Sequence, residues 1–267
     1  MSAHASSAAA TWRVGGTEIA CLVDGGGRFG ADVFPSADDE TRAARLAAAG
    51  LEAIDTVYNA YLLRHDDGGI DLVDTGCGTA FGDAGGALAG QLAAFGIAPA
   101  QVNRLIMTHL HGDHAGGGTR DGAAVFPEAE LVLHAAELPR WQGVDAPGGR
   151  LLAAMAGRIR TVADGEDLGR DLRSWHLPGH TPGHMGLRFG EDLVLVADIL
   201  HSEAMQLPDP ACASRYDDDA ATATRTRLAA LEEIVTRGLL WSGSHMLGPG
   251  KFARLTRDAG GYRRIAP

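Results

Sequence analysis

The residues best suited to chemistry lie in one short stretch, His109-Leu110-His111-Gly112-Asp113-His114. At about 3.6 residues per turn, a helix would point these three imidazoles and the carboxylate in all directions. A loop can gather them, and residues 102–107 before it predict a short buried strand, while Gly112 lets the backbone turn. Nitrogen and carboxylate ligands predict a site for Zn²⁺, or for Mn²⁺, Fe²⁺ or Co²⁺. The alternative is a histidine-rich surface loop.

Three further side chains of the same kind follow at predicted junctions of strand and loop. His180 lies in the turn-rich segment 177–184, Asp198 follows the apolar run 193–197, and His245 follows the apolar run and turn 239–244. A junction of this kind lets a rigid backbone aim a ligand. The recurrence favours a metal site over a surface loop.

The pattern resembles the metallo-β-lactamase superfamily over nearly the whole chain, from about Thr17 to the C-terminus. The HxHxDH motif of that family, its later ligands and its early strand-end aspartate match residues found here: His109, His111, Asp113, His114, His180, Asp198, His245 and Asp74. The resemblance implies an α/β fold of the αββα type, with two mixed β-sheets flanked by helices. The fold hosts many hydrolytic and some redox chemistries, so it indicates the substrate less well.

Two positions narrow the choice within the family. Asp198 stands where many class B β-lactamases carry a cysteine, which favours a bridged two-metal site, and His111 stands where redox di-iron members carry glutamate, which indicates hydrolysis. The narrower resemblance is to methyl parathion hydrolase-like and lactonase-like members, through residues 22–25, 197–201, 206–210, 215–217, 243–245 and 261–263. Such enzymes hydrolyse lactones, aryl esters or organophosphate triesters.

The chain departs from those relatives in two ways. Related acyl-homoserine lactonases carry a tyrosine three residues after the bridging aspartate, where this chain has His201. Apart from Trp141, the sequence shows no aromatic-rich pocket of the kind expected in an efficient organophosphate hydrolase. Thioester hydrolases of the glyoxalase II type add a helical domain with basic residues, whereas this chain has one lysine and ends soon after His245.

The resemblance implies the metal ligands of each site. It assigns His109, His111 and His180 to one ion, Asp113, His114 and His245 to the other, and Asp198 to a bridge between them. Two ions held about 3.5–4 Å apart lower the pKa of a shared water and clamp the reacting oxygen. Asp113 is also a candidate proton relay. Asp74 is expected to hold a ligand imidazole, or otherwise to cap the turn at Thr75-Gly76.

Other side chains receive more limited roles. His184 is expected to order the Pro-Gly turn rather than to bind metal, and His201 to donate to the substrate oxyanion or leaving group, or else to face solvent. Trp141, with Met205 and Leu207 opposite it, forms a candidate apolar substrate pocket, although all three could be core. The remaining candidates are interpreted as structural, and the acidic run as a helix cap: His65, His134, His176 and residues 217–219.

Composition and periodicity predict one globular enzyme domain over residues 13–267, after a disordered tail over residues 1–12. The 267 residues suffice for one large core, and 45% hydrophobic and 21% charged residues are ordinary for a globular protein. Strands are predicted over residues 17–23, 57–63, 70–73 and 130–134, and helices over residues 86–95, 135–141 and 218–235. Similar content on both sides of residue 145 fits two sheets sandwiched between helices.

The net charge and the cysteine content limit the possible partners and the possible compartment. A net charge of −11 argues against nucleic acid and anionic membranes, and no apolar run approaches the ~20 residues of a membrane span. Residues 1–10 lack the basic start and apolar core of a signal peptide. Cys21, Cys77 and Cys212 are widely spaced, which favours a reduced cytoplasm, although Cys77 follows the Asp74 loop closely.

Together these features predict a cytoplasmic dinuclear metallohydrolase, most simply a zinc enzyme, for small neutral esters. Lactones come first, then aryl esters and organophosphate triesters. A neutral substrate is inferred from the scarcity of lysine and from the lack of an anion-binding motif. The alternatives are a β-lactamase-like or thioester hydrolase and, from another class, a non-catalytic metal-binding protein. A homodimer is expected from the resemblance alone.

Overall fold

Two main β-sheets pack face to face in this computed structural model, which describes residues 9–267. The larger sheet has the order β1-β2-β3-β4-β5-β8-β9 and the smaller one β10-β11-β12-β13-β14. The larger sheet consists of β1 (Ala10–Val14), β2 (Thr17–Phe29), β3 (Ile54–His65), β4 (Ile70–Val73), β5 (Arg104–Ile106), β8 (Glu130–His134) and β9 (Ile159–Val162). The smaller sheet consists of β10 (Asp167–Gly169), β11 (Leu172–His176), β12 (Met185–Phe189), β13 (Leu193–Leu195) and β14 (Leu240–Ser242).

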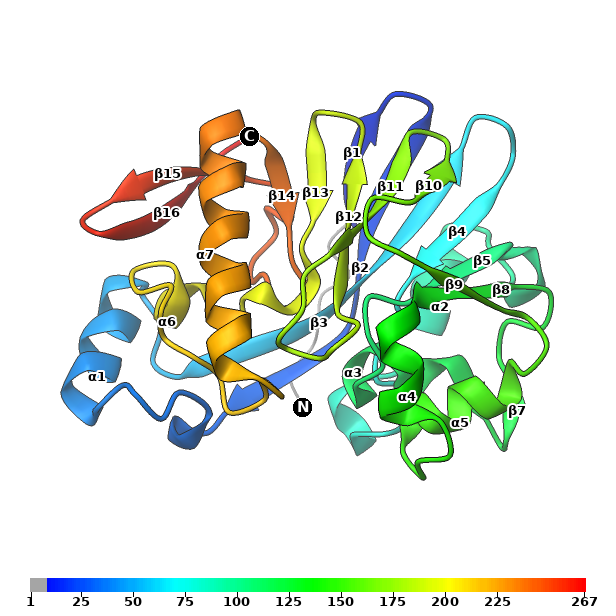
Figure 1. Cartoon of the computed structure of the whole chain (residues 1–267), viewed down its shortest axis with the longest axis horizontal. Coiled ribbons are helices and arrows are strands. Elements are labelled where there is room, and N and C mark those ends of the chain that lie inside the picture. The colour runs from blue at the N-terminus through cyan, green and yellow to red at the C-terminus, as the bar shows by residue number, and fades with distance from the viewer. Residues whose placement is uncertain (1–8) are drawn as a thin grey trace.

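Helices cover the two outer faces, and two small hairpins complete the fold (Figure 1). The α-helices are α1 (Asp39–Ala48), α2 (Leu88–Ala94), α3 (Gly112–Ala115), α4 (Leu138–Trp141), α5 (Pro147–Ala154), α6 (Glu203–Gln206) and α7 (Ala220–Arg237). The 3₁₀ helices are η1 (Ala31–Val33), η2 (Gly82–Ala84), η3 (Pro99–Gln101), η4 (Gly116–Gly118), η5 (Ala135–Glu137) and η6 (Ala197–Ile199). The hairpins are β6 (Thr119–Arg120) with β7 (Ala123–Ala124), and β15 (Arg254–Asp258) with β16 (Gly261–Ile265).

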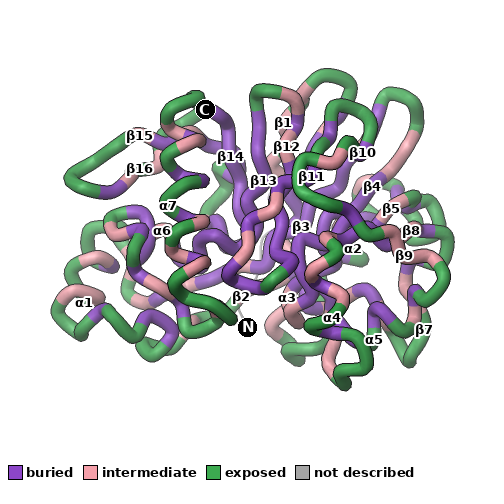
Figure 2. Tube along the Cα trace, viewed as in Figure 1, coloured by how far each residue is buried: buried purple, intermediate pink, exposed green. Residues whose placement is uncertain are grey.

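The strands of the larger sheet feed two separate cores. Leu131 and Leu133 of β8 join the cluster under α2 and α5, whereas Val132 between them joins the cluster between the sheets. This alternation follows because successive side chains of a strand point to opposite faces. Burial on both faces explains the continuous apolar runs, and Figure 2 shows the strands as the most buried part of the molecule. The predicted αββα sandwich is confirmed.

Helix α7 covers the outer face of the smaller sheet through Leu231 and Ile234, which pack with Trp241 of β14. The helix begins after Asp219, whose carboxylate accepts from the Thr222 N–H at 3.0 Å, and it ends at Gly238 with φ 61°. The sequence predicted a helix over residues 218–235 with Gly238 as its end, so the element is confirmed with its bounds shifted by two residues at each end.

The predicted tail over residues 1–12 is wrong in its last part. Residues 10–12 belong to β1, which pairs antiparallel with β2 from Ala10 opposite Cys21 to Val14 opposite Thr17. This short segment is ordered because β2 supplies its backbone hydrogen bonds and because the Trp12 ring packs against that of Phe252, 6.2 Å away. Residues 1–8 lie outside the described part. Across residues 9–267, none of the helices has the length and apolarity needed to cross a membrane.

A bulge in β2 anchors the long loop that follows β4. The β2–β3 register shifts between Val23 and Gly25, which leaves Asp24 free to turn its buried carboxylate toward the loop. The carboxylate accepts from the backbone N–H groups of Cys77 at 2.9 Å, Gly86 at 3.1 Å and Leu88 at 2.9 Å. Cys77 is therefore part of a hydrogen-bonded turn, and its thiol is buried. The loop also carries Phe81, whose ring packs against Tyr58 near the candidate metal centre.

Candidate metal centre

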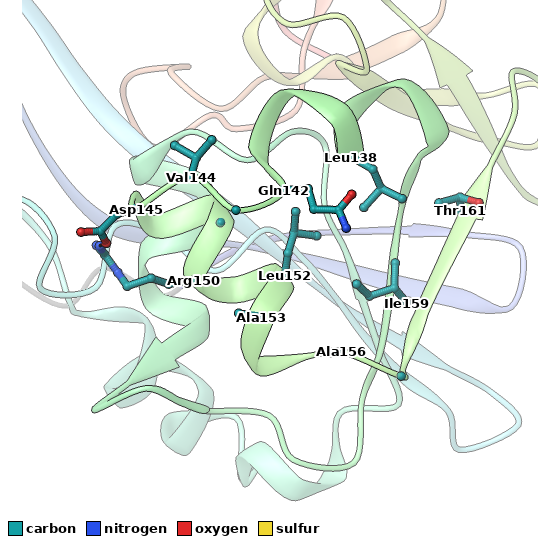
Figure 3. A pocket seen from close by; sticks show the side chains of 13 residues that line it. Leu138, Gln142, Val144, Asp145, Arg150, Leu152, Ala153, Ala156, Ile159 and Thr161 are labelled. Carbon is teal, nitrogen blue, oxygen red and sulfur yellow. Dashed lines mark hydrogen bonds and ion pairs between the residues drawn. The ribbon is translucent and has the colours of Figure 1, made fainter.

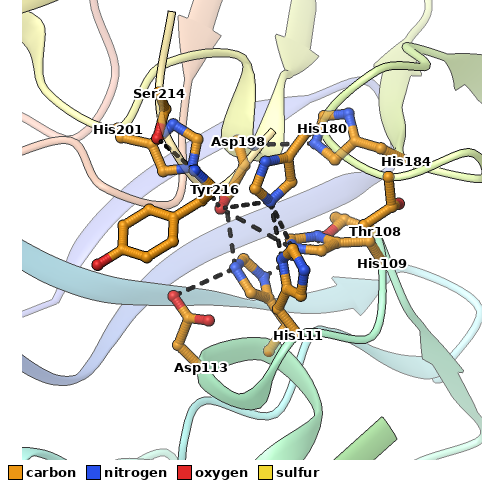
Figure 4. Close-up of polar contacts among 12 residues, drawn as sticks. Thr108, His109, His111, Asp113, His180, His184, Asp198, His201, Ser214 and Tyr216 are labelled. Atoms are coloured by element: carbon orange, nitrogen blue, oxygen red, sulfur yellow. Dashed lines mark hydrogen bonds and ion pairs between the residues drawn. The ribbon is translucent and has the colours of Figure 1, made fainter. Parts of the chain in front are cut away.

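The ends of parallel strands bring the ligand-type side chains to one edge of the sandwich. Strands β4 and β5 are parallel, so Asp74 and the His109–His114 stretch leave the larger sheet at the same edge. Strands β13 and β14 are parallel too, so Asp198 and His245 leave the smaller sheet together. His180 lies in the turn between β11 and β12. All seven predicted ligands meet there, and Figure 4 labels five of them, His109, His111, Asp113, His180 and Asp198.

The first group consists of three imidazoles that converge on one point. His109 Nε2 lies 3.0 Å from His111 Nδ1 and 3.1 Å from His180 Nε2, and His111 Nδ1 lies 2.9 Å from His180 Nε2. Three nitrogens bound at about 2.0–2.1 Å to one tetrahedral ion lie about 3.3–3.4 Å apart. The triangle is thus close to one face of a tetrahedral metal site.

The second group adds carboxylates and shares Asp198 with the first. Asp113, His114, Asp198 and His245 can each place a ligand atom within 4.8 Å of the others. Asp198 Oδ2 lies 3.0 Å from His245 Nε2 and 3.4 Å from His180 Nε2, and Asp198 Oδ1 lies 3.3 Å from His114 Nε2. Asp198 therefore contacts both groups, as a bridging ligand must.

The buried polar atoms test whether a metal suits this arrangement. Among residues 9–267, His114 Nε2 and Asp198 Oδ1 are buried without a hydrogen-bond partner, and so are both ring nitrogens of His201. An unpaired buried polar atom is costly, so such atoms call for an explanation. Two divalent ions held by the predicted ligands would satisfy His114 Nε2 and Asp198 Oδ1. The donor set of imidazoles and carboxylates fits the pair of divalent metal ions that the sequence predicted.

Asp74 supports the second group from behind. Its Oδ2 accepts from His114 Nδ1 at 2.8 Å and from Thr108 Oγ1 at 2.8 Å, and its Oδ1 accepts from the Thr108 N–H at 2.8 Å. The residue has φ 60°, a conformation that non-glycine residues seldom adopt. The structure therefore places Asp74 against a ligand imidazole. Fixing Nδ1 as the donor leaves Nε2 of His114 as the ligand atom.

Other ring nitrogens are held in the same way. His245 Nδ1 lies 2.9 Å from the Val57 carbonyl, which leaves Nε2 toward Asp198. His184 Nδ1 donates to the Leu177 carbonyl at 2.7 Å, and its Nε2 accepts from the Asp198 N–H at 3.0 Å. Both nitrogens of His184 are thus engaged with backbone, so it positions the Asp198 segment and has no free lone pair for a metal.

The sequence analysis missed a carboxylate that orients His180. Asp217 Oδ1 lies 3.2 Å from His180 Nδ1, and its Oδ2 faces the buried Arg227 guanidinium at 3.3 Å. Residues 217–219 were interpreted together as a helix cap, which holds for Asp219 but not for Asp217. The only signal was that Asp217 belongs to the segment 215–217 that resembles the lactonase-like relatives. A second carboxylate that the sequence did not reveal, Glu137, is buried beneath the loops that carry His109, His111 and His180.

Burial and charge divide the imidazoles of the metal-free protein into two kinds. Burial lowers the pKa of His109 well below 6.5 and that of His111 to about 4, so both are neutral with a free lone pair at neutral pH. Burial also opposes the charge on His114 and His245. The nearby carboxylates, Asp198 first and then Asp113, together outweigh burial and raise the pKa of both, that of His114 well above 6.5.

An aromatic rim surrounds the second group. Four rings from separate segments, Phe29, Tyr58, Phe81 and Tyr216, form this rim. Phe29 lies 5.8 Å and Tyr58 6.3 Å from the His245 ring, Phe81 packs on Tyr58 at 5.8 Å, and Tyr216 packs on Phe29 at 5.6 Å. Phe81 and Tyr216 are 46% and 42% exposed, so both rings are accessible from solvent. The expectation that aromatic side chains are scarce near the site is wrong.

The predicted substrate pocket of Trp141, Met205 and Leu207 is also wrong. These side chains are buried in three different core clusters, so they do not face one another. Trp141 instead packs edge-on against the His111 ring at 5.5 Å. Met205 is fully buried beside α1, and Leu207 lies under α7. The sequence could not distinguish pocket from core, because both use the same residue types.

The histidines predicted to be structural lie apart from the ligand groups. His65 is buried between Thr17 Oγ1 and Asp71 Oδ2, each 2.8 Å away. His134 and His176 stack on each other at 3.8 Å. A hollow of about 640 Å³ between α4, α5 and β9 is lined by apolar residues such as Leu138, Leu152 and Ile159, and none of the predicted ligands lines it (Figure 3).

The αββα sandwich with a histidine–aspartate cluster at its edge defines a class of metal-binding hydrolases. A sequence profile described as metallo-beta-lactamase superfamily matches residues 53–234, and the chain belongs to that family. A human relative, metallo-beta-lactamase domain-containing protein 1, is 36% identical over 110 residues, which cover 41% of this chain and 34% of the human protein.

Two solved structures extend the likeness to the whole fold. The hydrolase AbOPH of the beta lactamase superfamily is 26% identical, with a TM-score of 0.87 over 96% of each chain. AidC, a dizinc quorum-quenching lactonase, is 21% identical, with a TM-score of 0.89 over 97% of each chain, and shows likeness of fold. The chain therefore has the fold of this superfamily, with a histidine–aspartate cluster of the metal-binding type at the edge of its sheets.

Proposed function

We propose that the protein is a dinuclear metal-dependent hydrolase of small neutral esters, with lactones first and aryl esters and organophosphate triesters next. The observation that carries this proposal is the position of Asp198 between two groups of ligand-type residues. Two divalent ions, most simply zinc, would supply an activated water and polarise the substrate carbonyl or phosphoryl oxygen. By likeness, the dizinc lactonase AidC supports lactones as substrates, and the hydrolase AbOPH supports a hydrolytic reaction.

Residues of the chain itself would supply proton transfer and substrate contact. Asp113 is only partly buried, with its Oδ2 3.7 Å from His245 Nε2, so it can take a proton from the attacking water. The exposed rings of Phe81 and Tyr216 offer an apolar surface to a neutral ester or aryl leaving group. A net charge of −11 disfavours anionic substrates.

A panel of six substrates tests the proposal on protein loaded with zinc or manganese. The panel holds a γ-lactone, dihydrocoumarin, an acyl-homoserine lactone, methyl paraoxon, a cephalosporin and a glutathione thioester. Turnover of the lactones or the phosphotriester supports the proposal. Turnover of only the cephalosporin or the thioester would assign the chain to another branch of the family. No turnover of any of the six substrates by protein that has metals bound would favour a non-catalytic metal-binding protein.

His201→Ala should lower kcat about 10²-fold, since removing one positioned donor to a developing oxyanion costs at least this much. Both ring nitrogens of His201 are buried and unpartnered within the described residues, and Nε2 lies 3.7 Å from Asp198 Oδ2. Burial and the neighbouring His180 lower its pKa well below 6.5, so the ring is neutral and can donate one N–H. Stopped-assay kinetics with metal analysis measure the effect.

Metal content separates a donor role for His201 from a ligand role. The donor role requires His201→Ala to retain both metals and His201→Gln, which keeps an N–H donor, to recover part of the rate. A loss of metal in His201→Ala would make His201 a ligand instead, as its place in a group with His180 and Asp198 allows.

Phe81→Ala and Tyr216→Ala should each raise KM for an aryl ester by about tenfold, as the loss of one aromatic contact of about 1.4 kcal/mol implies. An ester with a small alkyl leaving group should be affected less, because it makes less ring contact. Leu228→Ala is the matched control, since Leu228 is similarly exposed but lies on α7, outside the aromatic rim. Equal changes for both ester types would contradict a role in substrate contact.

A further inference from the structure

A single buried carboxylate joins the two loops that carry the first ligand group. Glu137, the last residue of η5, has no exposed surface. Its Oε1 accepts from the Leu110 N–H at 3.1 Å and from Trp141 Nε1–H at 2.6 Å. Its Oε2 accepts from Thr181 Oγ1–H at 2.6 Å and from the Gly183 N–H at 3.0 Å. Four donors from three segments therefore converge on one side chain.

Each oxygen serves one of the two ligand loops. Leu110 stands between His109 and His111, so Oε1 fixes the backbone between those two ligands. Thr181 follows His180 directly, so Oε2 fixes the turn that carries the third ligand. Glu137 thus ties together the two loops that carry the three imidazoles of the first group, although it is not itself a ligand, while Asp217 orients the His180 ring from the other side.

Packing strengthens this connection. A Cβ built on Gly183 would lie 2.3 Å from the Glu137 backbone nitrogen, so only glycine lets the turn approach so closely. Trp141 donates to Glu137 and also places its ring edge-on to His111 at 5.5 Å. The position of the His111 ring therefore depends on Glu137 through backbone and side chain alike.

The second ligand group is supported by other residues. His114 is held by Asp74, and His245 by the carbonyl of Val57. Among the described residues, the four hydrogen bonds that the Glu137 side chain accepts reach none of these supports. Any effect of Glu137 on metal binding should accordingly be confined to the first group.

We propose that Glu137 is a positioning residue that sets the metal affinity of the His109, His111 and His180 group without setting that of the other group. The proposal rests on the dinuclear site of the proposed function. A glutamine at this position keeps the shape but turns one oxygen into an NH₂ group facing two N–H or O–H donors. The loop on that side loses its acceptor, and the three imidazoles lose their common geometry.

The test compares Glu137→Gln in two backgrounds, each of which keeps one ligand group whole. His245→Ala disables the second group, and His111→Ala disables the first. Zinc titration against a chromophoric chelator measures the affinity that remains, and the visible spectrum of the cobalt-loaded protein reports its geometry. In His245→Ala, Glu137→Gln should weaken binding by about 10–100-fold and alter the cobalt bands. In His111→Ala, it should change binding by less than about twofold.

Two milder variants keep the test decisive if Glu137→Gln does not fold. Trp141→Phe removes one donor to Oε1, and Thr181→Val removes one donor to Oε2; each should weaken the first site alone, by less than Glu137→Gln does. Equal weakening of both sites, or unchanged affinity in protein with a native circular dichroism spectrum, would overturn the positioning role. A parent protein that binds fewer than two zinc ions would instead overturn the dinuclear function, so the two failures are distinguishable.

Discussion

Asp198→Ala is expected to lower hydrolytic turnover by about 10³-fold, because a catalytic metal contributes several kcal/mol of transition-state stabilisation. Asp198 contacts both ligand groups, through Oδ2 toward His180 at 3.4 Å and His245 at 3.0 Å and through Oδ1 toward His114 at 3.3 Å. Its loss removes the one carboxylate that the two groups share. At least one metal should be lost along with the activity.

The measurement combines kcat/KM on the best substrate of the panel with metal analysis of the same sample. Asp219→Ala is the matched control, since it also removes a carboxylate, but one that caps α7. The control should keep both metals and full turnover, with a lower melting temperature. Turnover by Asp198→Ala within about tenfold of the parent, with both metals retained, would show that Asp198 is not the bridge.

The sequence was sufficient to single out the candidate ligands that the fold brings together, because their types are chemically specific and most of them follow apolar runs. His109, His111 and His114 are adjacent in sequence, so one loop had to hold them. His180 was found because it lies in a turn-rich segment, and Asp198 because it follows an apolar run that predicts a strand. The parallel pairing of β13 with β14, which brings Asp198 to His245, was implied only by the family resemblance.

The supporting residues could not be predicted because nothing local distinguishes them. Glu137 lies in a segment that predicts an ordinary helix start, and its burial depends on two loops distant in sequence. Phe29, Phe81 and Tyr216 come from three separated segments, and only the tertiary fold collects them into a rim. The pairing of β1 with β2 likewise depends on the partner strand, since residues 10–12 alone carry little strand signal.

Metal loading of the second group is expected to release protons, at least one per protein at neutral pH. The pKa values of His114 and His245 are raised in the metal-free protein because Asp198 and Asp113 together outweigh the effect of burial. A metal must displace these protons to reach the ring nitrogens. His111, with its pKa lowered to about 4, and His109 bind without losing one. The two groups should therefore differ in their pH dependence.

The raised pKa values of His114 and His245 also determine how the stability of the metal-free protein changes with pH. A raised folded-state pKa stabilises the metal-free protein fully below about pH 6.5, where the unfolded imidazoles are also protonated. This stabilisation is lost as the pH rises through the folded-state values. Zinc affinity has the opposite trend and falls as the pH drops, approaching about tenfold per pH unit for each proton displaced. The rise in melting temperature on adding zinc should thus be larger at pH 8 than at pH 6.

Calorimetric zinc titration in two buffers of different ionisation enthalpy counts the protons released. His111→Ala, which keeps the second group, should retain the buffer dependence, and His245→Ala should lose part of it. Asp74→Asn is the sharpest variant, because it removes a negative charge 2.8 Å from His114 Nδ1 and so lowers the pKa of that imidazole. Fewer protons should then be released. Binding heats that are identical in both buffers would mean that the two imidazoles are already neutral, and that Asp198 does not hold a charged pair before the metal arrives.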